Sequence, residues 1–176
     1  MPVVYVTCGV AFSGKSTLAR RLAVQSGATL IRLDDINAER GFDGGAVDDD
    51  RQWELTSFIA LGRLCDVLTR GGDAIVDDTF SHRFLRERFR RIAEAWRAGF
   101  VILELRTSPK VIAARRAANA RTQRRQSVED AIFARHVARF QWPAPEERAV
   151  VLNDEVDIAR WLATSMRAVV GVPRRG

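Results

Sequence analysis

Eight residues near the N-terminus, Gly9-Val10-Ala11-Phe12-Ser13-Gly14-Lys15-Ser16, match the pattern GxxxxGK[ST], and Thr17 follows them. Glycines in such a loop let backbone N–H groups turn inward around phosphate oxygens, and the next helix points its positive N-terminal dipole at the same anion. The lysine reaches the β- and γ-phosphates, and the serine coordinates magnesium. The motif therefore predicts an ATP and Mg²⁺ site formed by Gly9, Ser13, Gly14, Lys15, Ser16 and Thr17, with Ser16 as a metal ligand.

Five short β-rich runs alternate with helical patterns along the chain, at residues 3–8, 29–33, 74–77, 100–105 and 149–152. Alternation of this kind favours a parallel sheet with crossover helices. The runs are nearly all apolar, as expected for strands that helices cover on both faces. The phosphate-binding loop (P-loop) lies between the first run and a helical pattern at 15–26. We therefore predict a three-layer α/β fold with one doubly wound sheet.

The helical patterns carry their own signals. In residues 83–97, Leu85, Phe89, Ile92 and Trp96 repeat at intervals of 4, 3 and 4 residues, which predicts one apolar stripe with the arginines on the opposite face. Ser108-Pro109 and the pair Ser127 and Asp130 mark the starts of two later helices.

Length and composition predict one domain. The chain has 176 residues, 47% of them apolar, which suffices for a core of its own. Neither a membrane span nor a signal peptide is expected, so we predict a cytoplasmic protein, either a monomer or a weak dimer. Cys8 and Cys65 lack the spacing of a disulfide framework or a zinc site and are interpreted as reduced core residues.

Carboxylates follow the second and third strand runs. Asp34 and Asp35 end the second run, at the sheet edge beside the P-loop, where a carboxylate can accept the proton of an attacking hydroxyl. We favour Asp34 as this general base; the alternative for Asp35 is a helix cap. Asp78 and Thr79 end the third run, and Asp78 is predicted to hold magnesium through water or to orient the acceptor. The alternative is again a helix cap.

Arginines dominate residues 106–139, where nine basic residues face two acidic ones for a net charge of +7. Two short helices joined by residues 119–125 would form a mobile lid, at about residues 108–140, that brings guanidinium groups to the transferring phosphoryl group. We assign this role to at least one of Arg115, Arg116 and Arg121, and interpret Arg135 and Arg139 as a solvated helix face.

Residues 34–50 have the opposite bias, with seven acidic residues and one basic residue, for a net charge of −6. An acidic region beside the acceptor would attract a cationic acceptor and repel a polyphosphate backbone. It therefore weakens the nucleic-acid interpretation of the overall charge of +6. The two histidines, His82 and His136, are interpreted as surface or capping residues.

The combined pattern resembles the small P-loop kinases that group with the 5′-hydroxyl kinase domain of polynucleotide kinases, together with zeta toxins, gluconate kinases and chloramphenicol phosphotransferases. The resemblance spans residues 1–155 and rests on the P-loop, Asp34-Asp35, Asp78-Thr79 and the arginine-rich lid before Phe140. It implies a sheet order of 2-3-1-4-5, Asp34 as the general base, Asp78 near the acceptor or magnesium, and a lid arginine that stabilises the transition state.

The chain departs from the polynucleotide kinases at the acceptor site. They place an arginine three residues after the base, where this chain has Asn37, and Arg40 one turn further on is the candidate substitute. They also place asparagine after the Asp-Thr pair, where this chain has Phe80.

We therefore predict an ATP- and magnesium-dependent kinase for a hydroxyl of a small acceptor, such as a cationic antibiotic or a nucleoside. Asp35, Asp78, Thr79 and Arg40 are its candidate acceptor-binding residues. The alternatives are a 5′-hydroxyl polynucleotide kinase and an ATP-dependent regulatory protein that transfers no phosphoryl group to a hydroxyl.

Overall fold

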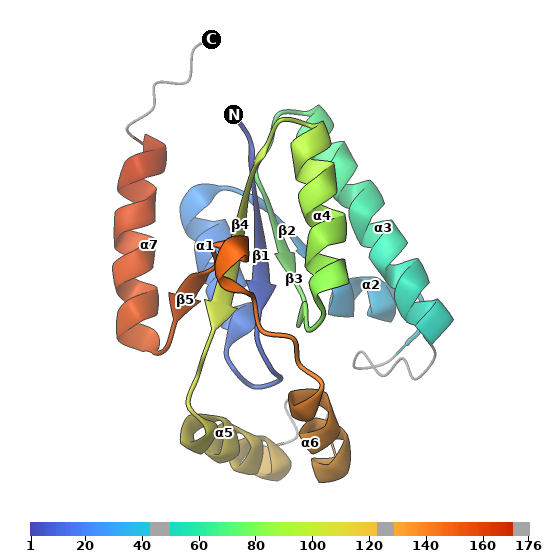
Figure 1. The fold of residues 1–176 in the computed structure, drawn as a ribbon, viewed down its shortest axis with the longest axis vertical. Coiled ribbons are helices and arrows are strands. Elements are labelled where there is room, and N and C mark those ends of the chain that lie inside the picture. Colours follow the sequence, from blue (N-terminus) through green and yellow to red (C-terminus); the bar gives the residue numbers. More distant parts are fainter. Residues whose placement is uncertain (43–49, 123–128, 171–176) are drawn as a thin grey trace.

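The protein forms a parallel five-stranded sheet with helices on both faces, seen in a computed structural model that describes residues 1–42, 50–122 and 129–170 (Figure 1). The strand order is β2-β3-β1-β4-β5, which confirms the predicted order. The strands are β1 (Val3–Cys8), β2 (Thr29–Arg32), β3 (Ala74–Asp77), β4 (Gly99–Leu105) and β5 (Val150–Leu152). The helices are α1 (Lys15–Ser26), α2 (Leu33–Glu39), α3 (Asp50–Thr69), α4 (Arg83–Ala95), α5 (Pro109–Thr122), α6 (Asp130–Ala138) and α7 (Glu155–Val170).

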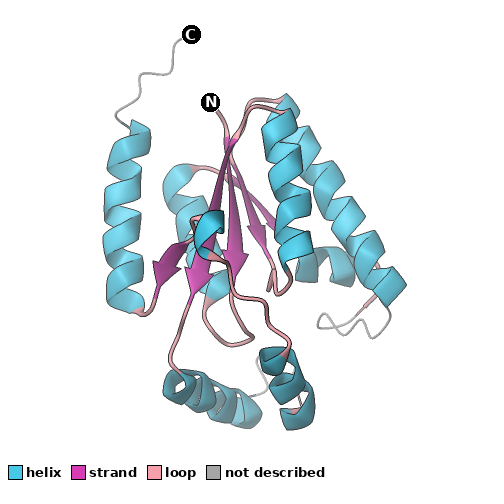
Figure 2. Ribbon diagram, viewed as in Figure 1, coloured by secondary structure: helices cyan, strands magenta, loops and turns pink. Residues whose placement is uncertain are grey.

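Two separate cores form because successive strand residues point to opposite faces of the sheet. On one face, Val4 and Val6 of β1 pack with residues of α3 and α4, including Leu64 and Phe89. On the other face, Tyr5 packs with residues of α1 and α7. Figure 2 shows the strands as the middle layer between these two helical layers. The sheet is thus covered on both sides, which explains why its strands are almost entirely apolar.

The lid helices α5 and α6 lie below the carboxyl ends of the strands, on the side of the sheet where the P-loop connects β1 to α1 (Figure 1). Helix α5 continues to Thr122, so the predicted joint at 119–125 is wrong in its first part. Asn119 is buried, so this last part of α5 packs against the rest of the protein. Residues 123–128, with Arg124, Arg125 and the predicted cap Ser127, lie outside the described residues; Glu129 is the residue before α6.

Two local predictions need correction. Strand β2 ends at Arg32 and α2 begins at Leu33, so Asp34 and Asp35 lie in the first turn of a helix rather than at a strand end. Carboxylates are favourable there because the helix N-terminus carries a partial positive charge. In α4, Arg86 is buried although the arginines were predicted to be exposed, and Trp96 at the helix end is 41% exposed.

The acidic segment is described only in part, because residues 43–49 lie outside the described residues. Among its described members, Glu39 forms an ion pair with Arg63. Across the described ranges, no helix combines the length and the apolar character needed to cross a membrane.

Candidate functional site

The P-loop is shaped by glycines at its two ends. A Cβ at Gly9 would lie 2.9 Å from Ser13 Oγ and 3.0 Å from the Leu105 carbonyl oxygen, so only glycine fits without a shift of the neighbouring backbone. Gly14 has φ of 103°, in the left-handed region that side chains rarely adopt, and it precedes the first residue of α1. The N–H of Gly9 also donates to the carbonyl oxygen of Thr79 at 3.1 Å. The loop is therefore fastened to the segment that follows β3.

Lys15 folds back into the loop that it follows. Its side chain is buried, and Nζ donates a hydrogen bond to the Val10 carbonyl oxygen at 2.9 Å. Ser13 Oγ is also buried and has no hydrogen-bond partner within the described part of the chain. Ser16 is half-buried and Thr17 is exposed at the rim of the loop. The predicted nucleotide ligands therefore occupy one continuous turn around the start of α1.

Asp78 lies in the same electrostatic environment as Lys15. Burial raises the pKa of the Asp78 carboxyl to about 6; the Thr79 N–H and Lys15 lower it, while Asp34 and Asp77 raise it further. Thr7 Oγ1 fixes the local backbone by donating to the Asp78 carbonyl oxygen at 2.9 Å. Lys15 and Asp34 each lie within electrostatic reach of Asp78.

The two carboxylates of α2 differ in their partners. Asp35 accepts a hydrogen bond from Arg32 Nη1 at 2.6 Å, and the same arginine lies 3.4 Å from Asp77 Oδ2 through its Nε. Asp34 is exposed, and it is the α2 carboxylate that acts on the titration of Asp78. Of the pair, Asp34 is therefore the one that influences Asp78.

Arg40 and Asn37 hold α2 against α3. Arg40 Nη1 donates to the Gln52 carbonyl oxygen at 2.8 Å and also to Thr56 Oγ1, and its guanidinium lies 5.0 Å from the centre of the Phe42 ring. Asn37 is fully buried and accepts a hydrogen bond from Thr56 Oγ1. The hydrogen bonds of Arg40 therefore link α2 to α3.

The three candidate lid arginines have different surroundings. Arg115 Nη1 donates to two P-loop carbonyl oxygens, those of Phe12 at 3.1 Å and Ser13 at 2.9 Å. Arg116 instead joins the two lid helices, through an ion pair with Asp130 at 2.5 Å and a stacking contact 4.2 Å from the centre of the Phe133 ring. Arg121 is exposed in the last turn of α5. Arg115 therefore links the lid to the P-loop.

A pocket opens beside the P-loop between the lid and α7. Its lining residues are Phe12, Gly14, Thr17, Arg115 and Glu155. These residues come from the phosphate loop, the start of α1, the lid and the start of α7. The pocket is therefore shared by the P-loop, the lid and α7.

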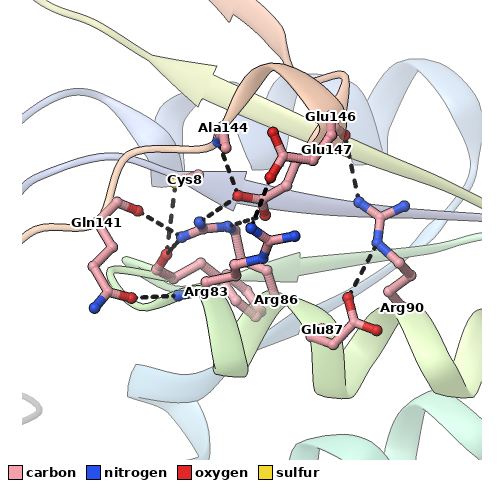
Figure 3. A network of polar contacts seen from close by, with 10 residues as sticks. Cys8, Arg83, Arg86, Glu87, Arg90, Gln141, Ala144, Glu146 and Glu147 are labelled. Carbon is pink, nitrogen blue, oxygen red and sulfur yellow. Dashed lines mark hydrogen bonds and ion pairs between the residues drawn. The ribbon is translucent and has the colours of Figure 1, made fainter.

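A buried ion pair that sequence reasoning missed supports the segment after Asp78 (Figure 3). Arg86 donates to both carboxylate oxygens of Glu147, at 2.7 and 2.8 Å, and through Nη1 to the carbonyl oxygens of Phe80 and Gln141, at 2.8 and 2.9 Å. A signal did exist, because Arg86 shares helical spacing with the buried Phe89 and Ala93. No sequence pattern marked Glu147 as its partner.

Comparisons with known proteins agree with this geometry. Residues 4–143 match the AAA domain family. Three solved structures share the fold: a candidate kinase of Chloroflexus aurantiacus (TM-score 0.73, 18% identity, 97% of both chains), a gluconokinase from Sinorhizobium meliloti (0.65, 21%, 97% of both chains) and Chaetomium thermophilum Kti12 in complex with ADP-AlF3 (0.67, 18%, 94% of this chain and 98% of that chain). No curated protein matches the sequence. The predicted resemblance to the small P-loop kinase group is confirmed.

Proposed function

The chain belongs to the AAA domain family, and from this premise we propose that it is an ATP- and magnesium-dependent kinase. It transfers the γ-phosphoryl group of ATP to a hydroxyl group of a small acceptor. The observation that carries the proposal is the hydrogen bond from the Gly9 N–H to the Thr79 carbonyl oxygen at 3.1 Å, which fastens the P-loop to the segment of Asp78. Lys15 and Asp34 both influence the titration of Asp78. A phosphate-binding lysine beside two carboxylates provides what phosphoryl transfer needs. The lysine binds the phosphates of the donor, and a carboxylate activates the acceptor hydroxyl.

Asp34 is the general base in this proposal. Its exposed carboxylate accepts the proton of the acceptor hydroxyl as the oxygen approaches the γ-phosphorus. Asp78 orients the acceptor or a metal-bound water, and Thr79 and Asp35 border the same site. The N–H groups of the P-loop and Lys15 hold the phosphates.

Magnesium fits the residues present. Within the described ranges, no group of three or more His, Cys, Asp or Glu side chains is placed to hold a metal ion. Magnesium characteristically binds through one or two protein ligands together with substrate phosphates and water, and Ser16 and Asp78 would supply those ligands. When bound, the ion neutralises charge on the β- and γ-phosphate oxygens.

The contacts of Arg115 support a role at the nucleotide. Its bonds to the Phe12 and Ser13 carbonyl oxygens place its guanidinium on the P-loop, and it lines the pocket with Thr17. We propose that this pocket binds the nucleoside part of ATP and that the Arg115 guanidinium binds the phosphates of ATP. Arg116 and Arg121 are the alternative candidates for contacting the phosphates of ATP when the lid closes.

A small acceptor is favoured over a polynucleotide. The position at which the related polynucleotide kinases grip the acceptor phosphate is Asn37, which is buried against α3. Arg40 is held by Gln52 and Thr56, and breaking those bonds to reach a phosphate would cost stability. A small acceptor without a phosphate group needs neither side chain.

The test is transfer of labelled γ-phosphate from Mg·ATP to a panel of sugars, nucleosides, aminoglycosides and 5′-hydroxyl oligonucleotides. Lys15→Ala serves as the blank. For the acceptor that takes label, Asp34→Asn should lower the transfer rate by about 10²-fold or more, the usual scale for a lost general base. The exposed Asp66 on α3 provides a matched charge control, and Asp66→Asn should retain the wild-type rate.

The outcomes separate the competing functions. Label on a small acceptor supports the proposal and names the substrate class. Label on an oligonucleotide replaces it with a polynucleotide kinase. ATP binding without transfer to any hydroxyl favours a regulatory protein, and an Asp34→Asn variant with an unchanged rate excludes Asp34 as the base.

A further inference from the structure

A row of polar side chains crosses the carboxyl ends of three neighbouring strands. Arg32 is the last residue of β2, Asp77 is the last residue of β3, and Thr7 lies one residue before the end of β1. These strands lie side by side in the order β2-β3-β1, and Arg32 and Asp77 are register partners (Figure 1). Thr7 and Asp77 are buried in strands that are otherwise mostly apolar. Buried polar groups are costly unless they are hydrogen-bonded, so the row depends on its own contacts.

The contacts of the row run without a break from β2 to β1. Arg32 Nε lies 3.4 Å from Asp77 Oδ2. Thr7 Oγ1 lies 3.1 Å from Asp77 Oδ1 and 2.9 Å from the Asp78 carbonyl oxygen, so its hydroxyl can donate to either, and it accepts from the Asp78 N–H at 3.3 Å. Asp77 is therefore held from both sides, and the row ends on the backbone of Asp78.

The opposite end of the row reaches helix α2. Arg32 Nη1 donates to Asp35 Oδ1 at 2.6 Å, in the first turn of α2. Asp34, the proposed base, is the neighbouring residue in that turn. The Arg32 side chain is only 19% exposed, so solvent screens its contacts less than those of a surface pair. One guanidinium thus joins the turn that carries Asp34 to the strand that leads into Asp78.

Arginine suits this position because its planar fork offers N–H groups in two directions. Nε and Nη1 of Arg32 contact carboxylates on two different elements, β3 and α2. Helix α2 has 7 residues, and an isolated helix of that length is not stable by itself. The place of α2 therefore depends on tertiary contacts of this kind.

We propose that Arg32 is a positioning residue of the kinase, which fixes the first turn of α2, and with it the base Asp34, relative to Asp78 and the P-loop. This inference rests on the proposed function. Arg32 acts through Asp35 and Asp77 and contacts neither the nucleotide nor the acceptor. Phosphoryl transfer needs the attacking oxygen in line with the γ-phosphorus, and a misplacement of about 1 Å can lower the rate by about 10²-fold. Loss of Arg32 should therefore slow transfer more than it weakens nucleotide binding.

The test measures kcat and the KM for Mg·ATP with the acceptor that takes label from the panel, and Mg·AMPPNP binding by calorimetry. Arg32→Met removes both N–H contacts, so it should lower kcat by about tenfold or more, while the KM for Mg·ATP and the AMPPNP affinity stay within about twofold. Arg32→Lys keeps the charge and should recover part of kcat. Arg63→Met is the matched control, because Arg63 forms an exposed ion pair with Glu39 at the other end of α2, and it should retain the wild-type kcat.

A second variant breaks the row without touching Arg32 and decides the case if Arg32→Met fails to fold. Thr7→Val keeps a branched side chain that suits a strand and removes the hydroxyl between Asp77 and Asp78. It should lower kcat with unchanged AMPPNP binding, and Thr7→Ser should restore kcat.

The outcomes distinguish this inference from the proposed function. An unchanged kcat in Arg32→Met and Thr7→Val, or an equal loss of kcat and AMPPNP affinity, would overturn the positioning role while the kinase function stands. A wild-type protein that labels no acceptor would refute the proposed function, and this inference with it.

Discussion

Replacing Arg86 with leucine should lower the free energy of unfolding by about 3–5 kcal/mol, the usual cost of breaking a buried ion pair on one side. The side chains of Arg86 and Glu147 are 1% and 7% exposed. Without the guanidinium, the Glu147 carboxylate keeps the Ala144 N–H at 2.9 Å as its one hydrogen-bond donor among the described residues, and the Phe80 and Gln141 carbonyl oxygens each lose a donor. The loss of stability therefore comes more from buried polar groups left without hydrogen-bond partners than from the lost attraction between Arg86 and Glu147.

The neighbouring pair provides a matched control. Arg83 and Glu146 come from the same helix and the same turn as the buried pair and lie 2.8 Å apart, but their side chains are 55% and 59% exposed. Exposed ion pairs contribute roughly 0–1 kcal/mol, so Arg83→Leu should be nearly neutral. The difference between the two variants isolates the effect of burial.

Urea unfolding at pH 7 measures both variants, with unchanged m-values as the check for two-state behaviour. The double variant Arg86→Leu/Glu147→Leu should be more stable than Arg86→Leu alone, because it removes the unpaired carboxylate. Burial acts to raise the pKa of Glu147, but its bonds to Arg86 and Ala144 outweigh this and lower it. The contribution of the pair is therefore present above the unfolded pKa of about 4.3 and is lost as pH falls through the folded value. Equal costs for Arg86→Leu and Arg83→Leu at pH 7 would refute this reasoning.

Three further predictions concern the site. Because the pKa of Asp78 is raised to about 6, the nucleotide-free protein should lose stability as pH rises from about 4 to 6, and Asp78→Asn should flatten this dependence in thermal unfolding. Arg115→Ala should weaken Mg·ATP binding by about tenfold in calorimetry, since two bonds to the P-loop vanish, while Lys110→Ala on the same helix has no effect. Gly9→Ala should abolish nucleotide binding and leave a folded protein by circular dichroism, because the new Cβ meets Ser13 Oγ at 2.9 Å.

The strands and the P-loop were predictable because their signals are local. Apolar runs that alternate with helical patterns identified all five strands to within one residue, and the GxxxxGK[ST] pattern placed the loop between β1 and α1. The role proposed for Asp34 rests on a local signal as well, since the residue closely follows a strand. The boundary at Leu33 was missed because Asp34 and Asp35 suit a helix start as well as a strand end.

The partnerships between distant residues depended on the tertiary structure. Arg40 was expected to face the acceptor, yet Gln52 and Thr56 of α3 satisfy it. His136 was expected to be a surface or capping residue, yet its Nε2 is buried.

The sequence by itself determined the order of strands and helices, the phosphate loop and the acidic residues beside it, because each depends on a few neighbouring residues. Only the tertiary structure decided that Arg86 is buried on Glu147, that Arg115 binds the P-loop and that Arg116 pairs with Asp130. A charged side chain can interact with solvent or with any oppositely charged or hydrogen-bonding group nearby. Which of these partners it contacts depends on which helices and strands pack together.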